Sequence, residues 1–268
     1  MQVNSPQVMA IVNVTPDSFS DGGQFDSVQE AVERALRYVE EGADWLDIGG
    51  ESTRPGAAAV DVNEELERVI PVIEGIRQHS SVPISIDTSK AQVMQAAVES
   101  GATMINDVCA LQQPGALDVA AKLQVPICLM HMQGTPRTMQ QNPHYNNVVE
   151  DVLHFLDTRK QACIEAGIAL DDILFDPGYG FGKSVSHNYS LVAGIASLAA
   201  TGHKVLVGMS RKSMIGAVTG RPVEDRLAGS IVLATLAMQN GAHILRVHDV
   251  KETVDAVKIF QTYQQYAN

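Results

Sequence analysis

Several apolar runs in this sequence end abruptly at a polar or charged residue, and Asp176 is the clearest example. Residues 173–175 predict a buried strand that stops at this carboxylate, and Pro177 and three glycines follow within residues 177–182. Because a lone carboxylate is costly to desolvate, we expect Asp176 at the mouth of a site, facing a group that pairs with it. The alternative is a turn in which the carboxylate caps the next backbone amides.

The same pattern recurs at other strand ends, where the side chains suggest a ligand. Asp87 and Asn106 each follow a short apolar run, and with Asp176 they offer several hydrogen-bond acceptors and one amide. Such a set suits a flat, nitrogen-rich ring that carries many N–H donors and few acceptors. Lys212, beyond the run at residues 204–209, is placed to meet a carbonyl oxygen or a nitrogen of that ring.

A second group of side chains is positively charged and suits an anion. Arg246, His248 and Arg54 lie at or just beyond predicted strand ends, and beside helix N-termini they fit a phosphate or diphosphate. Asn13 ends the first predicted strand and offers a hard oxygen ligand. The expected cofactor is therefore Mg²⁺, with Asn13 as its protein ligand and a diphosphate as its second partner.

Composition narrows the class of protein. The 268 residues are 45% hydrophobic but only 5% aromatic, which is typical of parallel strands packed against helices. A net charge of -12 argues against nucleic-acid binding, which needs a basic face. Three cysteines without a C-x-x-C pair favour a reducing cytoplasm over a disulfide framework. No signal peptide and no apolar run long enough for a membrane span are expected.

Short strands and helices alternate along the whole chain. The predicted strands end at residues 13, 47, 87, 106, 131, 176, 210 and 246, and a helical stretch follows each of them. Eight such units close readily into a barrel whose functional face is the carboxyl end of the strands. We therefore predict an α/β protein with one domain over residues 1–268, a single (β/α)₈ TIM barrel. An open doubly wound sheet is the alternative, weakened because the first βα turn lacks G-x-G-x-x-G.

Local signals set the expected helix boundaries. Ser27 and Glu30 form a capping-box pattern for the first helix, and Ser89 is expected to cap a helix over residues 90–100. The other expected elements near the site are helices over residues 114–123, 187–200 and 223–240 and a solvated loop over residues 139–142.

Longer motifs in the sequence resemble the dihydropteroate synthase family. Residues 11–21 (IVNVTPDSFSD) are similar to its first signature, and residues 42–56 (GADWLDIGGESTRPG) to its second. Departures are slight, because Trp45 replaces a usual aliphatic residue and Tyr179 stands where an aliphatic residue or Phe is common. Shorter matches follow in order at residues 86–88, 105–107, 175–183, 210–213 and 246–249, so that the resemblance covers about the whole chain.

The resemblance implies a transferase of folate synthesis that joins (7,8-dihydropterin-6-yl)methyl diphosphate to 4-aminobenzoate. By this likeness the residues that hold the pterin are Asp87, Asn106, Asp176 and Lys212. Those that engage the diphosphate are Arg246, His248, Thr53 and, through Mg²⁺, Asn13. Those that border the 4-aminobenzoate pocket, where sulfonamides compete, are Phe19, Pro55, Phe181 and Ser213. The residues expected to act in catalysis are Asp87, Asp176, Lys212 and Arg246, and the likeness suggests a homodimer through the outer helices.

The residue types agree with this chemistry, and they also leave alternatives. Diphosphate leaves well when cations take up its charge, and two carboxylates would favour a ring that develops positive charge, so an S_N1-like route is our hypothesis. A methyltransferase that passes a methyl group from methyltetrahydrofolate to a corrinoid would share the pterin carboxylates. A Schiff-base aldolase that uses Lys212 and a non-catalytic pterin-binding homologue are the other candidates.

Overall fold

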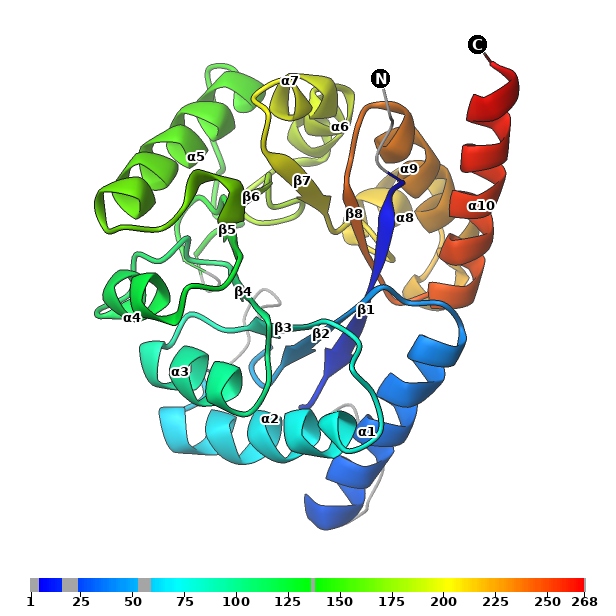
Figure 1. Ribbon diagram of the computed structural model, residues 1–268. Coiled ribbons are helices and arrows are strands. Elements are labelled where there is room, and N and C mark those ends of the chain that lie inside the picture. Colours follow the sequence, from blue (N-terminus) through cyan, green and yellow to red (C-terminus); the bar gives the residue numbers. More distant parts are fainter. Residues whose placement is uncertain (1–4, 16–23, 53–58, 136–137, 268) are drawn as a thin grey trace.

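Eight parallel strands form a closed barrel in chain order, and helices surround it (Figure 1). The computed structural model describes residues 5–15, 24–52, 59–135 and 138–267. The strands are β1 (Gln7–Asn13), β2 (Trp45–Gly49), β3 (Ile84–Asp87), β4 (Met104–Asp107), β5 (Ile127–Met130), β6 (Ile173–Asp176), β7 (Lys204–Val207) and β8 (Ile244–Val247). Since β8 also pairs with β1, the sheet has no free edge. The predicted (β/α)₈ barrel is confirmed.

The helices cover the outside of the barrel and bury their apolar faces against the strands. They are α1 (Gln24–Glu40), α2 (Val62–Arg77), α3 (Ala91–Glu99), α4 (Ala116–Leu123), α5 (Val148–Glu165), α6 (Val185–Ala193), α7 (Ile195–Ala199), α8 (Ser213–Thr219), α9 (Leu227–Gln239) and α10 (Val250–Tyr266), with the 3-10 turns η2 (Leu170–Asp172) and η3 (Val223–Asp225). Alternate strand residues such as Val8, Ala10 and Val12 are fully buried in this outer core.

The interior of the barrel changes from apolar to polar along the strands. Its apolar part is a cluster of buried side chains, namely Met9, Met104, Cys128, Leu174, Leu206 and Ile244. Side chains alternate with a period of two, so the residue two positions further along each strand faces the same interior. Asn106 therefore stands above Met104, and Asp176 above Leu174. Arg246 follows the same rule in β8, which places polar groups at the carboxyl ends.

In three helices the expected N-terminal signal is not the one that the structure uses. α1 starts at Gln24, so Ser27 lies inside its first turn and not at its cap. Ser89 does not cap α3, because its hydroxyl donates to the carboxylate of Asp107. α4 starts two residues after Pro114, with the left-handed Gly115 at its N-cap. In each case tertiary or backbone geometry overrides a local capping signal.

The expected helix over residues 187–200 is two helices in the structure. Ser184 caps α6 and forms a capping box with His187. α6 ends at Gly194, where a Cβ atom would lie 2.7 Å from a methyl group of Val149 in α5. Glycine therefore permits the close approach of α5, and α7 begins beyond it.

The connection after β7 contains an additional helix, α8. The expected helix over residues 223–240 is divided into η3 and α9. Arg226 lies between them and donates to the carbonyls of Arg211 and Arg221. Its guanidinium also packs on Gly216 of α8, where a Cβ atom would lie 2.3 Å from it. This packing separates the two helical segments.

The cysteines and the helix lengths bear on two expectations, that there is no disulfide framework and that there is no membrane span. All three cysteines are free, and Cys128 and Cys163 are buried. Within the described ranges, none of the helices combines the length and the apolar character that a membrane crossing requires.

Candidate active site at the carboxyl ends of the strands

Arg246 binds two carboxylates from neighbouring strands. Its Nε donates to Oδ2 of Asp47 at 2.5 Å, and its Nη2 donates to Oδ2 of Asp87 at 2.7 Å. The amide nitrogen of Asn106 lies 3.4 Å from both carboxylate oxygens of Asp47. The register of the sheet causes this meeting, because Asp87 is paired with Gly49 on one side and with Asn106 on the other. Three of the predicted site residues thus belong to one hydrogen-bonded group.

This pairing corrects one part of the predicted arrangement. The charge pattern predicts Arg246 in a separate cluster with other cations, whereas the structure places it among the ring acceptors. Only two of its N–H groups are used by Asp47 and Asp87, and a guanidinium carries five. The remaining N–H groups can still bind an anion beside the carboxylates.

Asp176 and Lys212 form the second part of the site. The Oδ1 atom of Asp176 accepts a hydrogen bond of 2.7 Å from the backbone N–H of Gly178. Lys212 donates to the carbonyl of Tyr179, and its ammonium lies 4.8 Å from the centre of the Phe181 ring. The glycine-rich segment after β6 thus holds both the carboxylate and the lysine.

The charged groups of the two parts act on one another. Burial raises the pKa of Asp176, and the charges of Lys212 and Arg246 oppose this rise. Burial lowers the pKa of Lys212 to about 8, although the carboxylates of Asp176 and Asp87 favour its charged form. Burial likewise raises the pKa of Asp87 to about 7, although Arg246 favours its charged form. Asp87, Asp176, Lys212 and Arg246 therefore lie close enough together, at one end of the barrel, to act on one another.

Sequence reasoning missed Asp47. It is fully buried and forms a direct ion pair with Arg246. The signal was present, because Asp47 ends a predicted apolar run just as Asp87 does. Since a buried carboxylate requires a partner, Asp47 belongs with the candidate site residues.

Sequence reasoning also assigned no role to His131 or to Lys183. Both side chains are buried, and the Lys183 ammonium lies 2.9 Å from Nδ1 of His131. Burial lowers the pKa of Lys183 to about 7, and burial and the charge of Lys183 lower the pKa of His131 to about 3. The histidine is therefore neutral and accepts a hydrogen bond from the lysine.

The segment after β5 is exposed over residues 140–142, as expected for a solvated loop, but it also contributes one buried side chain and one long-range contact. Met139 is 3% exposed, and the side-chain amide of Gln140 donates to the carbonyl of Gly180 at 2.5 Å. The polar composition of residues 139–142 did not indicate this contact, because the partner of Gln140 lies 40 positions away along the chain.

The other predicted residues lie at the rim or outside the described ranges. The imidazole Nδ1 of His248 lies 3.1 Å from the hydroxyl of Ser210, and Ser213 is exposed at the start of α8. Asn13 is half-buried at the end of β1. Four predicted residues, Phe19, Thr53, Arg54 and Pro55, lie outside the described residues.

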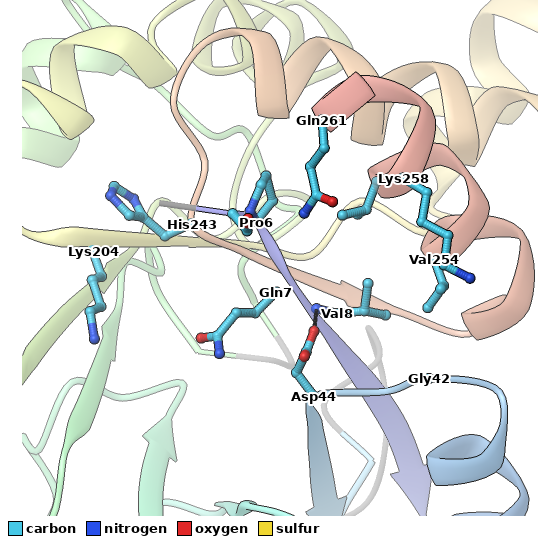
Figure 2. Close-up of a pocket in the computed structure, with 12 residues that line it drawn as sticks. Pro6, Gln7, Val8, Gly42, Asp44, Lys204, His243, Val254, Lys258 and Gln261 are labelled. Carbon is cyan, nitrogen blue, oxygen red and sulfur yellow. Dashed lines mark hydrogen bonds between the residues drawn. The ribbon is translucent and has the colours of Figure 1, made fainter. Parts of the chain in front are cut away.

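A separate cavity of about 470 Å³ lies at the amino ends of the strands, between β1 and α10 (Figure 2). Its polar groups hold the strand ends together: Asp44 accepts from the N–H of Val8 at 2.8 Å, and Gln7 accepts from the indole of Trp45 at 3.2 Å. Those predicted site residues that the structure describes belong to the opposite end of the barrel.

The structure is a (β/α)₈ barrel whose carboxyl ends gather buried carboxylates, a lysine and an arginine, and the carboxyl ends of the strands are where barrel enzymes have their active sites. The family described as pterin binding enzyme matches residues 9–248 of this chain. The dihydropteroate synthase of Haemophilus influenzae is 52% identical over 97% of this chain and 95% of its own length. The dihydropteroate synthase of Escherichia coli is 51% identical over 97% of this chain and 93% of its own length.

Solved structures agree with these relatives. A dihydropteroate synthase of Yersinia pestis, solved with a sulfonamide drug, is 49% identical and superposes with a TM-score of 0.94 over 99% of this chain and 96% of its own. A dihydropteroate synthase of Xanthomonas albilineans, solved with 7,8-dihydropteroate, is 52% identical. It superposes with a TM-score of 0.90 over 98% of this chain and 95% of its own. The chain belongs to the pterin-binding enzyme family, and within it to the dihydropteroate synthases, which are transferases.

Proposed function

We propose that this chain transfers the whole (7,8-dihydropterin-6-yl)methyl group from its diphosphate ester to 4-aminobenzoate. The products are 7,8-dihydropteroate, for folate synthesis, and diphosphate. The observation that carries the proposal is the convergence of Asp87, Asp176, Lys212 and Arg246 at one end of a barrel. The family membership supplies the identity of the substrates.

In this proposal the pterin ring lies on the strand-end acceptors. Asp87, Asn106 and Asp176 accept from the N–H groups of the ring, and Lys212 meets its carbonyl oxygen or a ring nitrogen. A buried carboxylate that receives such donors is better paired than one without them. Ring binding therefore offsets part of the desolvation cost that raises the pKa of Asp87 and of Asp176.

The reaction breaks the methylene C–O bond to the diphosphate and forms a C–N bond to the amine, which then loses a proton. Diphosphate takes the electron pair of the broken bond, and Arg246 and His248, with Thr53 and Arg54, are proposed to receive its charge. The carboxylates of Asp87 and Asp176 stabilise the positive charge that develops on the pterin, which favours the S_N1-like route. The aromatic amine needs no strong base, because it is nucleophilic near neutral pH.

Mg²⁺ is proposed as the cofactor. No cluster of three or more His, Cys, Asp or Glu side chains in the described part of the chain could hold a metal by itself. Mg²⁺ commonly takes one or two protein ligands plus substrate phosphates, so the single carboxamide of Asn13 fits that use. When bound, the ion would neutralise charge on the leaving diphosphate.

The second substrate is proposed to lie beside the ring of Phe181, with Ser213, Phe19 and Pro55 around it. Phe181 is half-buried under the ammonium of Lys212, which leaves part of its ring open to an aromatic partner. Sulfonamides, which mimic 4-aminobenzoate, are expected to compete there.

A coupled assay tests the proposed function. Purified protein, the pterin diphosphate, 4-aminobenzoate and Mg²⁺ should release diphosphate only when the amine is present. Removal of Mg²⁺ with EDTA should abolish turnover, and added Mg²⁺ should restore it; unchanged turnover in EDTA would refute the cofactor assignment. Diphosphate release without dihydropteroate would contradict the function itself.

The raised pKa of Asp87 predicts that pterin binding depends on pH. Because the charged carboxylate is the better acceptor and its pKa is about 7, the Kd of hydroxymethyl dihydropterin should fall as the pH rises from about 6 to about 8. Calorimetry at several pH values measures this change. In Asp87→Asn the Kd should be higher at every pH and nearly flat; an equally steep profile in the variant would assign the titration to another group.

A homodimer is proposed through the outer helices α9 and α10. These helices pack on each other and expose large apolar side chains, with Val232 58%, Ile259 70% and Tyr263 63% exposed. An Ile259→Asp variant should therefore weaken the dimer and shift the mass measured by light scattering towards that of one chain. An unchanged mass, with the helical circular dichroism intact, would exclude this face.

A cytoplasmic location is also proposed, because the free cysteines fit a reducing compartment.

A further inference from the structure

The loop between β6 and α6 is held at four successive backbone carbonyls. Each carbonyl accepts a hydrogen bond from a different side chain. The four pairs are Tyr179 with Lys212, Gly180 with Gln140, Phe181 with Lys183, and Gly182 with Tyr145. A loop anchored at every carbonyl over this stretch is a preformed wall of the site and does not need to order when a ligand binds.

The loop also packs directly on the end of β5. Gly178 and Gly182 adopt positive φ angles of 69° and 63°. A Cβ atom on Gly178 would lie 2.0 Å from the carbonyl oxygen of His131, and one on Gly182 would lie 2.6 Å from that of Gln133. Glycine is required at both positions, because any side chain would push the loop away from β5.

Lys183 is the side chain that joins this loop to β5. Its ammonium lies 2.9 Å from the Phe181 carbonyl, 3.2 Å from the His131 carbonyl and 2.9 Å from Nδ1 of His131. An ammonium has three N–H groups, so these three acceptors match it. The side chain is only 3% exposed, and burying an ammonium is costly. The dihydropteroate synthase mechanism proposed above gives this buried cation no part.

The group that Lys183 holds in place is Phe181. The ammonium donates to the Phe181 carbonyl, while the ring of Phe181 packs under the ammonium of Lys212, which is a predicted site residue. The pterin acceptors Asp87 and Asp176 lie on strands and are held by the sheet. Loss of the Lys183 contacts should therefore displace the aromatic ring more than these carboxylates.

We propose that Lys183, through its contacts with His131 and with the Phe181 carbonyl, is a positioning residue for the aromatic amine substrate. The inference rests on the proposed function, because it assumes that 4-aminobenzoate lies beside Phe181. In this proposal the lysine touches neither substrate and acts by fixing the wall on which the second one lies. Its charge also acts on Asp176, but less than burial, Lys212, the Gly178 N–H and Arg246 do.

A Lys183→Met variant tests the proposal, since it keeps an aliphatic chain and removes the three donors. We expect the KM for 4-aminobenzoate to rise about 10-fold, because small displacements of a positioning wall have effects of this order. The Kd of hydroxymethyl dihydropterin, measured by calorimetry, should stay within about 2-fold of the parent value, which also shows that the variant folds. Lys204→Met, on an exposed lysine at the start of β7, is the matched control and should leave both quantities unchanged.

A double-variant cycle with Phe181→Leu separates positioning from general stability. If Lys183 acts through the Phe181 ring, Lys183→Met should add little to the KM of Phe181→Leu; additive effects would overturn the proposal. An unchanged KM, or a pterin affinity weakened by the same factor as the KM rises, would also overturn it.

If Lys183→Met does not fold, Lys183→Gln, which keeps two N–H donors, should give an intermediate KM. An unchanged KM in Lys183→Gln would refute the proposal. A parent protein that makes no dihydropteroate would instead refute the proposed function.

Discussion

An Asp176→Asn variant is expected to bind hydroxymethyl dihydropterin about 100-fold more weakly than the parent protein. The substitution removes a buried charged acceptor that faces Lys212 and replaces it with an amide whose NH₂ group opposes a ring N–H donor. Loss of a charged hydrogen bond at a buried site costs up to about 3 kcal/mol, which corresponds to about this factor. Isothermal titration calorimetry measures the change directly.

The matched control for this variant is Asp172→Asn. Asp172 lies in η2, just before β6, at the opposite end of the same strand. It should leave pterin binding unchanged while it alters the net charge in the same way. Unchanged binding in Asp176→Asn itself would remove this carboxylate from the pterin site.

Arg246→Met should produce the largest loss of stability among the site variants. The substitution leaves Asp47 and Asp87 buried beside each other without their cation. Removing one partner of a buried ion pair costs about 3–5 kcal/mol, which for a chain of this size lowers the melting temperature by roughly 10 °C. Differential scanning calorimetry of the parent and the variant provides the comparison.

The sign of the pH dependence distinguishes this cause from a simple packing defect. Arg246 opposes the rise that burial imposes on the pKa of Asp87, so without Arg246 that pKa lies still further above its unfolded value. The folded state is then penalised more strongly once the pH exceeds the unfolded pKa. The deficit of Arg246→Met should therefore be larger at about pH 8 than at about pH 5. Adding Asp47→Asn should restore part of the stability, and a deficit independent of pH would argue against the ion-pair explanation.

Arg246→Met should also separate the two halves of the first substrate. The KM for the pterin diphosphate should rise more than the Kd for hydroxymethyl dihydropterin, because only the former carries the anion. Some loss with the bare pterin is expected as well, since Arg246 also holds Asp87 in place. Equal losses for the two compounds would contradict a role in binding the diphosphate.

The sequence predicted which polar side chains stand at the strand ends, because a strand end is a local feature of the sequence. Each of Asp87, Asn106 and Asp176 ends an apolar run, and the alternation of strand side chains sends all three towards the barrel interior. Helix boundaries were less predictable. Ser89 carries a good capping signal, yet it bonds to Asp107, whose position depends on how β4 packs beside it.

The sequence by itself determined the alternation of strands and helices and the polar character of the carboxyl ends, and it favoured a closed barrel over an open sheet. Only the tertiary structure decided which charges share a partner, because Arg246 meets Asp47 from 199 positions away along the chain. Likewise, Lys183 reaches His131 across 52 positions. Local sequence fixes on which face of its strand a side chain stands, whereas its partner is fixed by the register and closure of strands that lie far apart in the chain.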